Sequence, residues 1–358
     1  MHVTPRSSLK RISCLFIVGL IKLQIACSFL IANHLQSGHD VKITTIRRYD
    51  SPERANTVEK VKTAIPRNIL GPPELLRSLK IGEHLNAFRR GRDDTNMDFK
   101  IERVAYGPDV FVLRNFLTES ECSEIQSIAK RSNMGEAETV TQDDFSSRKN
   151  CNVAWINSTE TSLVNNLVSA TANLLLSKEV LSHPSAGVED LQVLEYKTGG
   201  EYVLHHDGEP RVLTVIYYIN GVGGTWFPLA RTSNNENNDP CFQRNIDEDA
   251  MEERFMNARK QPMNKEQALD LGGGSNPGED GGGLLVKGVG NTKSQENENI
   301  AWISKGDAVA FYNYLDDGSG RLNWRAIHGG LPTEEKDGSK WIANHWFRVN
   351  QLDTQNRN

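Results

Sequence analysis

The sequence predicts an α+β domain in which N-terminal helices support a jelly-roll core of antiparallel strands. Two segments with helical periodicity come first, and a half rich in β-branched and aromatic segments follows them. Gly, Asp and Pro bound these segments, and no helical crossover separates them. Strands joined by turns pair antiparallel, which favours a sandwich or barrel over a parallel sheet.

The two predicted helices each have an apolar face and a capping signal. The first should begin at a capping box, in which Thr118 accepts from the backbone of Glu121 while the Glu121 side chain reaches back. The second covers the apolar repeat of residues 163–175, and its expected N-cap is Ser158 or Thr159. Both helices should therefore pack one face against the strands.

Five segments rich in β-branched and aromatic residues are the predicted strands. One precedes the helices and four follow them: Val110–Leu113, Leu191–Tyr196, Val212–Asn220, Ala308–Tyr314 and Trp341–Val349. The four later segments should supply the core of the jelly roll.

Residues 1–33 have the composition of a targeting segment. No acidic side chain occurs in residues 1–39, and basic residues precede an apolar run from Ile12 to Ala32. The run is just long enough to span a bilayer, but Lys22 near its centre opposes insertion. A cleaved signal peptide and a signal-anchor fit equally well, and a bipartite organelle-targeting leader is a third alternative.

The folded domain is expected to cover residues 106–350, with three segments apart from its core. Residues 34–105 hold several prolines and no sustained periodicity, which indicates a stalk or linker with one short helix over residues 73–85. Residues 231–300 are rich in Asn and Gly, so we expect a low-complexity, largely mobile insertion, with a substrate-gating loop as the alternative. Residues 351–358 form a tail.

Composition excludes several classes of protein. The 41 basic and 46 acidic side chains give a net charge of −5, which argues against nucleic-acid binding as the main activity. A mean hydropathy of −0.51 excludes a multi-span membrane protein, so any membrane contact is expected only through the leader. The 5 cysteines lack the spacing of zinc ribbons or redox motifs and leave room for at most one disulfide outside the leader.

His205 and Asp207 are the first candidate metal ligands. They are separated by one residue, so on an extended chain both side chains project to the same side. One imidazole and one carboxylate make two-thirds of the triad that binds non-haem Fe(II). The third ligand must be a later histidine, His328 or His345, and His328 is favoured because it lies where a strand begins. His206 alternates to the opposite face and is expected to be a wall residue.

Four ordered motifs surround these histidines. They cover Tyr196–Asp207, Gly223–Pro228, Gly306–Asn313 and His328–Trp346. In this order they resemble the prolyl 4-hydroxylase alpha-subunit-like family of Fe(II)/2-oxoglutarate-dependent dioxygenases. The resemblance implies a double-stranded β-helix (jelly-roll) as the core of the domain.

The resemblance also implies the ligands of the cofactors. His205, Asp207 and His328 would bind Fe(II), with no further catalytic side chain. Lys340 would pair with the distal carboxylate of 2-oxoglutarate, with Arg348 as the alternative, since a buried dianion needs a cationic partner. Three further residues would line the co-substrate pocket: Tyr196, Thr225 and Trp346.

Tyr202 and Arg148 are candidates for the substrate cleft. Tyr202 lies within the metal-binding motif, where a core aromatic residue is the alternative interpretation. Arg148 lies where the family often has a substrate-cleft arginine, and a surface arginine is the alternative.

The resemblance implies an enzyme similar to procollagen-proline 4-dioxygenase. Such an enzyme hydroxylates peptidyl proline in a proline-rich peptide or protein, consumes O2 and releases succinate and CO2, with L-ascorbate keeping the iron reduced. The same iron chemistry on a small molecule or a non-proline side chain is one alternative, and a non-catalytic binding sandwich is another. Together with the leader, the resemblance favours a location in the lumen of the endoplasmic reticulum or Golgi. The sequence does not indicate an oligomeric state.

Overall fold

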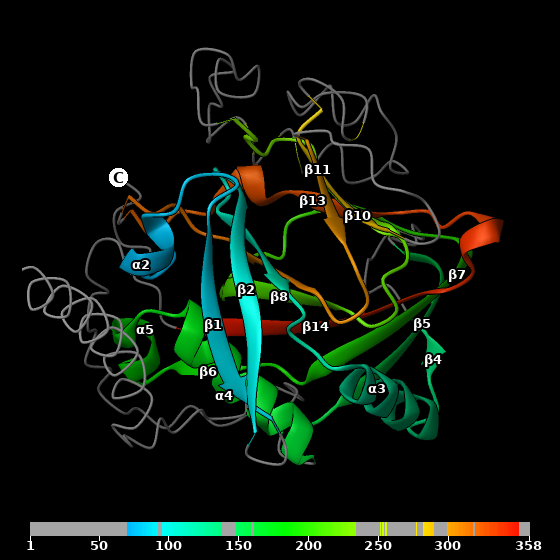
Figure 1. Ribbon diagram of the computed structural model, residues 1–358. Coiled ribbons are helices and arrows are strands. Elements are labelled where there is room, and N and C mark those ends of the chain that lie inside the picture. Colours follow the sequence, from blue (N-terminus) through cyan, green and yellow to red (C-terminus); the bar gives the residue numbers. More distant parts are fainter. Residues whose placement is uncertain are drawn as a thin grey trace, which may run out of the picture. The chain divides into compact units, whose positions relative to one another are not determined.

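The computed structural model describes the strands and helices of the unit Ile43–Asn358 (Figure 1). The described residues are 70–91, 95–137, 148–158, 161–233, 282–289, 299–317 and 319–350, with residues 251, 253, 255 and 277. The predicted leader and tail lie outside these residues. Within the described part of the chain, no helix is long and apolar enough to cross a membrane.

Two longer helices and four short helical segments have bounds within the described part of the chain. They are α2 Glu74–Arg77, α3 Glu119–Arg131, α4 Ser162–Leu175, α5 Lys178–Ser182, η2 Trp324–Ala326 and η3 Glu335–Asp337. The capping box of Thr118 and Glu121 at the start of α3 is confirmed. The predicted N-cap of α4 is wrong, because Thr161 rather than Ser158 or Thr159 accepts from the Val164 N–H. A cap lies one residue before the first helical turn, and α4 begins at Ser162, directly before the apolar repeat, so Ser158 and Thr159 lie too far upstream.

All fourteen described strands belong to one sheet. They are β1 His84–Arg90, β2 Asn96–Ala105, β3 Val110–Arg114, β4 Gly135–Glu136, β5 Arg148–Ile156, β6 Ala186–Val188, β7 Leu191–His205, β8 Arg211–Tyr218, β9 Gly224–Phe227, β10 Leu284–Gly288, β11 Ile300–Ile303, β12 Ala308–Tyr312, β13 His328–Leu331 and β14 Lys340–Val349. Their order is β1-β2-β3-β12-β8-β14-β7-β13-β9-β10-β11, with β5 also on β7 and β6 on β14. Each of the five predicted strands is present.

The sheet curls at β7, which is shared by its two halves. Residues 192–196 of β7 pair with β14, whereas Tyr202 and His205 pair with β13. Gly199 lies between these parts at a φ of +71°, and a Cβ on Gly200 would meet the Lys197 carbonyl oxygen at 2.7 Å. Glycine therefore permits the bend that folds β13, β9, β10 and β11 over the larger half. The result is the predicted jelly-roll, or double-stranded β-helix, core.

Alternate residues of β8 face two different cores. Leu213, Val215 and Tyr217 belong to the core that also contains residues of α3, α4 and α5, the helices in the lower half of Figure 1. Ile216 and Tyr218 belong to a second core inside the curl, which residues of β9 and β10 close from the other side. Because side chains alternate along a strand, one strand supports the helices and lines the interior at the same time.

Two segments that the sequence assigned outside the core contribute to the sheet. The prediction of a stalk is wrong for the described part of residues 34–105, because β1 and β2 form an antiparallel pair that joins β3. The helix expected over residues 73–85 is present only as the four residues of α2. Within the 231–300 insertion, β10 pairs with β9 and β11, and Met251 and Phe255 are buried. The insertion's other residues lie largely outside the described part.

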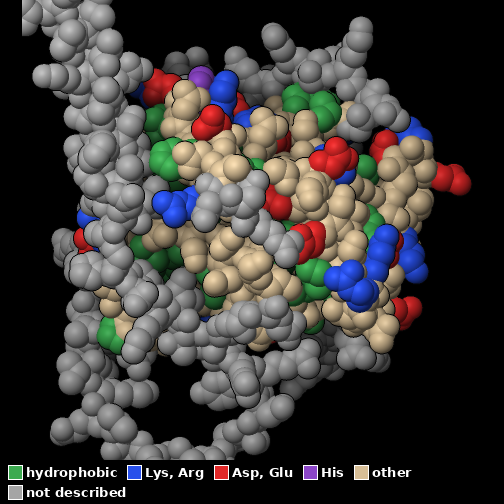
Figure 2. All heavy atoms as spheres, turned by 60° about the horizontal axis from the view of Figure 1, so that its bottom comes forward, with side chains coloured by type: hydrophobic (Ala, Val, Ile, Leu, Met, Phe, Trp, Pro, Cys, Tyr) green, Lys and Arg blue, Asp and Glu red, His purple; other side chains and the backbone are tan. Residues whose placement is uncertain are grey.

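The face of the molecule in Figure 2 carries mixed charge. Acidic and basic side chains lie next to one another among the described residues there, and hydrophobic side chains appear only as small separate patches. This face therefore has no broad basic area, in keeping with the net charge of −5.

Candidate active site

Three predicted ligands come together where β7 ends and β13 begins. His205 and His328 are direct partners across the β7–β13 pairing, and Asp207 follows β7 by two residues. The Nε2 atoms of His205 and His328 lie 3.8 Å and 4.0 Å from the two carboxylate oxygens of Asp207. One nitrogen or oxygen of each residue lies within 4.8 Å of the others. This set of two imidazoles and one carboxylate fits a non-haem Fe(II) ion.

Both imidazoles are held in one tautomer. The Nδ1 atom of His205 lies 2.9 Å from the Val203 carbonyl oxygen, and that of His328 lies 2.9 Å from the Ala326 carbonyl oxygen. A carbonyl can only accept, so each Nδ1 carries the proton and each Nε2 offers a lone pair. Burial lowers the pKa of both histidines below the ordinary value, which keeps them neutral as metal ligands must be.

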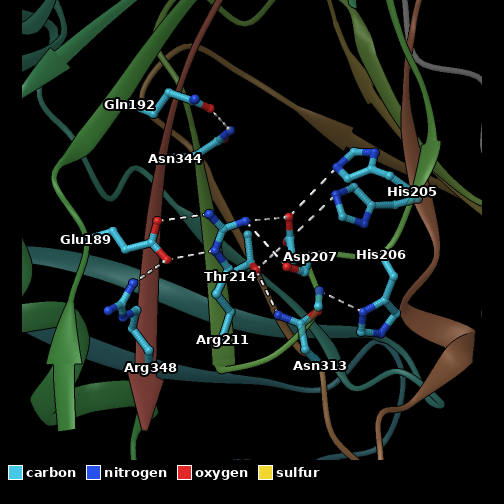
Figure 3. A network of polar contacts seen from close by, with 12 residues as sticks. Glu189, Gln192, His205, His206, Asp207, Arg211, Thr214, Asn313, Asn344 and Arg348 are labelled. Carbon is cyan, nitrogen blue, oxygen red and sulfur yellow. Dashed lines mark hydrogen bonds and ion pairs between the residues drawn. The ribbon is translucent and has the colours of Figure 1, made fainter. Parts of the chain in front are cut away.

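Asp207 is held by a chain of hydrogen bonds (Figure 3). Thr214 of β8 donates to Asp207 Oδ2 at 2.6 Å, and the Asn313 side-chain amide donates to Thr214 at 3.0 Å. Burial opposes ionisation of Asp207, but His328, His205, Arg211 and the Thr214 hydroxyl outweigh it, so the pKa stays below its usual range. The carboxylate is therefore charged near neutral pH.

Arg211 lies beside the three ligands and is itself fixed. Its guanidinium forms two hydrogen bonds with Glu189, at 2.7 Å and 2.9 Å, and lies 3.8 Å from Asp207 Oδ1 (Figure 3). It also stacks on Trp346, with the guanidinium carbon 4.0 Å from the ring centre. Arg348 lies 3.5 Å from the same Glu189 carboxylate. A rigid guanidinium of this kind can orient groups next to the metal site.

The structure separates the histidines that the sequence left in competition. His345 lies on the helix-facing side of β14, where its Nδ1 is 3.2 Å from the Tyr217 hydroxyl. That side belongs to the other core, so His345 does not reach Asp207. His206 also points away from the ligands and makes its own contacts with the backbone of Asn323 and Gly208.

Lys340 lies at the first residue of β14 and inside the curl. It is 1% exposed, and its ammonium donates to the Gly224 carbonyl oxygen at 2.7 Å. Among the described residues no carboxylate forms an ion pair with it, and burial lowers its pKa to about 8. Its Nζ would be 3.6 Å from a Cβ at Gly330, which is two residues beyond His328. An unneutralised buried cation near the metal ligands suits an anionic ligand.

The other predicted pocket residues lie at two ends of the same surface. Tyr196 is the cross-strand partner of Lys340, whose Nζ is 5.5 Å from the Tyr196 ring centre. Thr225 exchanges a hydrogen bond of 2.7 Å with Tyr218, another neighbour of Lys340. Trp346 is six residues along β14, about 20 Å away at roughly 3.3 Å per residue, so it lies beside Arg211 rather than beside Lys340.

The two candidate cleft residues contact each other beside His205. The ring centres of Tyr202 and His205 are 3.7 Å apart, and the Arg148 guanidinium lies 4.2 Å from the Tyr202 ring centre. Arg148 also donates to Gln192 at 3.4 Å. Tyr202 therefore borders the metal cluster, and Arg148 is connected to the cluster through Tyr202.

Several residues that contact the site were not predicted. They support or neighbour Asp207, and they are Glu189, Arg211, Thr214 and Asn313. Only Asn313 fell within a quoted motif. The alternation of β8 could have placed Thr214 on the same face as Ile216 and Tyr218, but it places Arg211 on the opposite face, and the contacts of Thr214 and Arg211 with Asp207 depend on the turn after β7.

The sequence matches known proteins over this region. A profile of the 2OG-Fe(II) oxygenase superfamily matches residues 191–348. Probable prolyl 4-hydroxylase 8 of Arabidopsis thaliana is 26% identical over 275 residues, which are 72% of this chain and 75% of that protein. The transmembrane prolyl 4-hydroxylase of Homo sapiens is 27% identical over 191 residues, which are 45% of this chain and 30% of that protein.

A solved structure covers a similar part of the chain. The 2OG complex of viral collagen prolyl hydroxylase from Paramecium Bursaria Chlorella virus-1 covers 67% of this chain and 96% of its own, with 19% sequence identity and a TM-score of 0.38.

The curled sheet and the cluster of two histidines and one aspartate define an oxygenase whose cofactors are Fe(II) and 2-oxoglutarate. The matched region begins at the first residue of β7 and ends in β14, so it contains the three clustered residues and Lys340. Residues 191–348 are thus similar to the 2OG-Fe(II) oxygenase superfamily, and the relatives of the chain include prolyl 4-hydroxylases.

Proposed function

We propose that this protein is a prolyl 4-hydroxylase in which His205, Asp207 and His328 bind Fe(II). The observation that carries the proposal is the convergence of two Nε2 lone pairs on one ionised carboxylate. Carbonyl groups orient both imidazoles, and a threonine orients the carboxylate, which is the support that metal ligands ordinarily have.

When bound, Fe(II) and 2-oxoglutarate supply oxidising chemistry that couples decarboxylation to succinate and CO2 with hydroxylation of a C–H bond. The chain's own residues position the reactants and exclude water. Burial of Lys340, Tyr196 and Thr225 inside the curl provides a site of low polarity in which charge-assisted hydrogen bonds are strong.

Lys340 is proposed to bind the distal carboxylate of 2-oxoglutarate, with hydroxyl groups of Tyr196 and Thr225 nearby. Burial raises the pKa of Tyr196 well above its usual value, so its hydroxyl stays protonated and can donate. Arg348 is the weaker candidate because it already lies 3.5 Å from the Glu189 carboxylate, beside Arg211 and away from Lys340. Trp346 is proposed to wall the opposite end of the site, beside Arg211.

The proposed substrate is a peptidyl proline in a proline-rich chain. Relatives of this protein carry the name prolyl 4-hydroxylase, and the matched region includes the whole metal cluster. The Tyr202 ring lies between His205 and Arg148, so its edge is the aromatic surface that it offers to a proline ring. The O2-dependent reaction would use L-ascorbate to keep the iron reduced.

A peptide assay tests this function. The full-length protein with Fe(II), 2-oxoglutarate and ascorbate is incubated with proline-rich peptides, and mass spectrometry detects the gain of one oxygen atom. His205→Ala should abolish the gain, while the control His84→Ala, which changes an exposed histidine of β1, should retain it. Full activity of His205→Ala would refute the metal assignment, and 2-oxoglutarate turnover without peptide hydroxylation would refute the substrate.

The domain boundaries and the cellular location belong to the same proposal. We place the catalytic domain at residues 106–350, with β1 and β2 as an N-terminal extension of its sheet. The leader is proposed to direct the chain into the secretory pathway. Relatives include a transmembrane prolyl 4-hydroxylase, which supports an endoplasmic reticulum or Golgi membrane location. Carbonate extraction of membranes distinguishes an anchored chain, which stays in the pellet, from a cleaved one, which is released.

A further inference from the structure

His206 makes two hydrogen bonds although it is not one of the clustered ligands. Its Nδ1 accepts from the Gly208 N–H at 3.0 Å, so its Nε2 carries the proton and donates to the Asn323 carbonyl oxygen at 3.0 Å. The ring also packs against Trp324, with centres 5.3 Å apart. Figure 3 shows His206 turned away from His205, on the other side of the chain that carries Asp207.

Asn323 connects His206 to the segment that carries His328. Its side-chain oxygen accepts from the Arg325 N–H at 3.2 Å and caps the short helix η2. The last residue of that helix is Ala326, whose carbonyl orients the His328 imidazole. His206 therefore contacts the segment that determines both the position and the tautomer of His328.

Asn323 is also connected to the third ligand. Its backbone N–H donates to the Asn313 carbonyl oxygen at 2.9 Å, and the Asn313 side chain donates to Thr214, which donates to Asp207. The segments bearing His205–Asp207 and His328 are thus linked on both sides of Asp207.

Strand pairing alone leaves His328 weakly held. β13 has only four residues, its register against β7 shifts between His328 and Gly330, and its pairing with β9 begins only at Gly329. Phe227 and Phe311 pack against the His328 ring, and the hydrogen bonds around Asn323 add a restraint on the segment that leads into β13.

We propose that His206 is a positioning residue whose hydrogen bond to Asn323 holds His328 against His205 and Asp207 and so sets the affinity for the metal. The inference rests on the proposed metal site. Loss of a group that orients metal ligands typically lowers metal affinity about 10- to 100-fold. Because His206 acts indirectly, through Asn323, its loss should lower the affinity by about tenfold, the lower end of this range.

The test uses Co(II) alone as the probe and the full-length protein, so it does not require activity. Dissociation constants and Co(II) absorption spectra are measured for wild type, His206→Leu, His206→Gln and His206→Asn. Leucine removes both hydrogen bonds, and asparagine reaches only the Nδ1 position, whereas glutamine places a donor near the Nε2 position. We expect Co(II) binding to weaken about tenfold with leucine and asparagine and to remain within about threefold of wild type with glutamine.

A matched control separates positioning from general stability. His183→Leu changes another partly buried histidine with local contacts at Ser185, and it should leave Co(II) binding unchanged. If His206→Leu does not fold, the Co(II) affinities of His206→Gln and His206→Asn are compared instead, because only glutamine keeps a donor near the Nε2 position. Equal Co(II) affinity in wild type and both variants would overturn the inference, whereas failure of wild type to bind Co(II) would instead refute the metal site itself.

Discussion

Replacing Lys340 with methionine should stabilise the protein in the absence of 2-oxoglutarate and weaken its binding of that co-substrate. Lys340 is buried with one hydrogen bond to Gly224 and no ion pair to a carboxylate among the described residues. Methionine has a similar length and no charge, so it can fill the same space.

The expected stability change follows from the lysine pKa. Burial lowers it from 10.5 to about 8, which corresponds to roughly 3 kcal/mol at about 1.4 kcal/mol per pKa unit. This free energy opposes folding near neutral pH, where the lysine is charged in both the folded and the unfolded chain. Leaving the Gly224 carbonyl without its donor costs about 1 kcal/mol, so the variant should be more stable by roughly 2 kcal/mol.

The stability difference should depend on pH with a definite sign. The folded pKa is the lower one, so from about pH 8 up to 10.5 the unfolded chain holds a proton that the folded chain has released. Wild-type stability therefore rises with pH across this window, and the advantage of methionine should shrink. Urea denaturation at several pH values measures both curves.

Co-substrate binding should change in the opposite direction. Removing one partner of a buried charge pair costs about 2 kcal/mol or more, so the dissociation constant for 2-oxoglutarate should rise at least about 30-fold. In wild type the affinity should be constant below about pH 8 and fall above it, because only the charged lysine attracts the dianion. Anaerobic calorimetry with Fe(II) present measures these constants.

An exposed lysine on the same sheet is the control. Lys197→Met, on β7, should change neither quantity. The reasoning is refuted if Lys340→Met is less stable than wild type near neutral pH and still binds 2-oxoglutarate with wild-type affinity.

Three further substitutions probe other parts of the molecule. Thr214→Val removes the donor to Asp207 and should weaken Co(II) binding about tenfold in titrations, and unchanged binding would show that the donor is dispensable. Arg148→Gln should raise the KM for peptide in steady-state kinetics, because Arg148 contacts Tyr202 at the proposed cleft, and should leave kcat and the affinity for 2-oxoglutarate unchanged. A fall in kcat with an unchanged KM would contradict this role. Thr118→Ala should lower the free energy of unfolding by about 1 kcal/mol in urea with full activity, and an unchanged midpoint would argue against the cap.

The strands that carry the site were predictable because local pattern and burial agree in them. β8 and β14 are buried on both faces and rich in β-branched and aromatic residues, so each is recognisable as a strand from its composition. The His205–Asp207 spacing is likewise a local property of an extended chain, so one side of the metal cluster could be recognised without knowing the fold.

The strands that were missed have weaker local signals. β1 and β2 are only partly buried, and their first residues are polar and exposed, so their sequences resemble a linker. β10 is a short apolar run beside glycine-rich residues, and only its pairing with β9 and β11 identifies it as part of the sheet. For such segments tertiary pairing, which no local pattern records, determines the structure.

The support of Asp207 was missed for a different reason. Thr214 and Asn313 are ordinary strand-region residues, and their proximity to Asp207 requires that β8 and β12 lie side by side under the turn after β7. Neither spacing nor composition gives that neighbourhood. The resemblance to a known family supplied ligand identities, but it did not supply the residues that hold those ligands in place.

The alternation of β14 explains why one strand can serve both the co-substrate and the helices. Lys340, Ile342 and Asn344 face the interior of the curl, whereas Ala343 and His345 face the helix side. A slip of one residue in its pairing with β8 would exchange the two sets, removing the cation from the interior and burying it against apolar helices. The unpaired charge of Lys340 therefore opposes every odd slip of the register, so the same residue that is proposed to bind 2-oxoglutarate also favours the correct pairing of the strand.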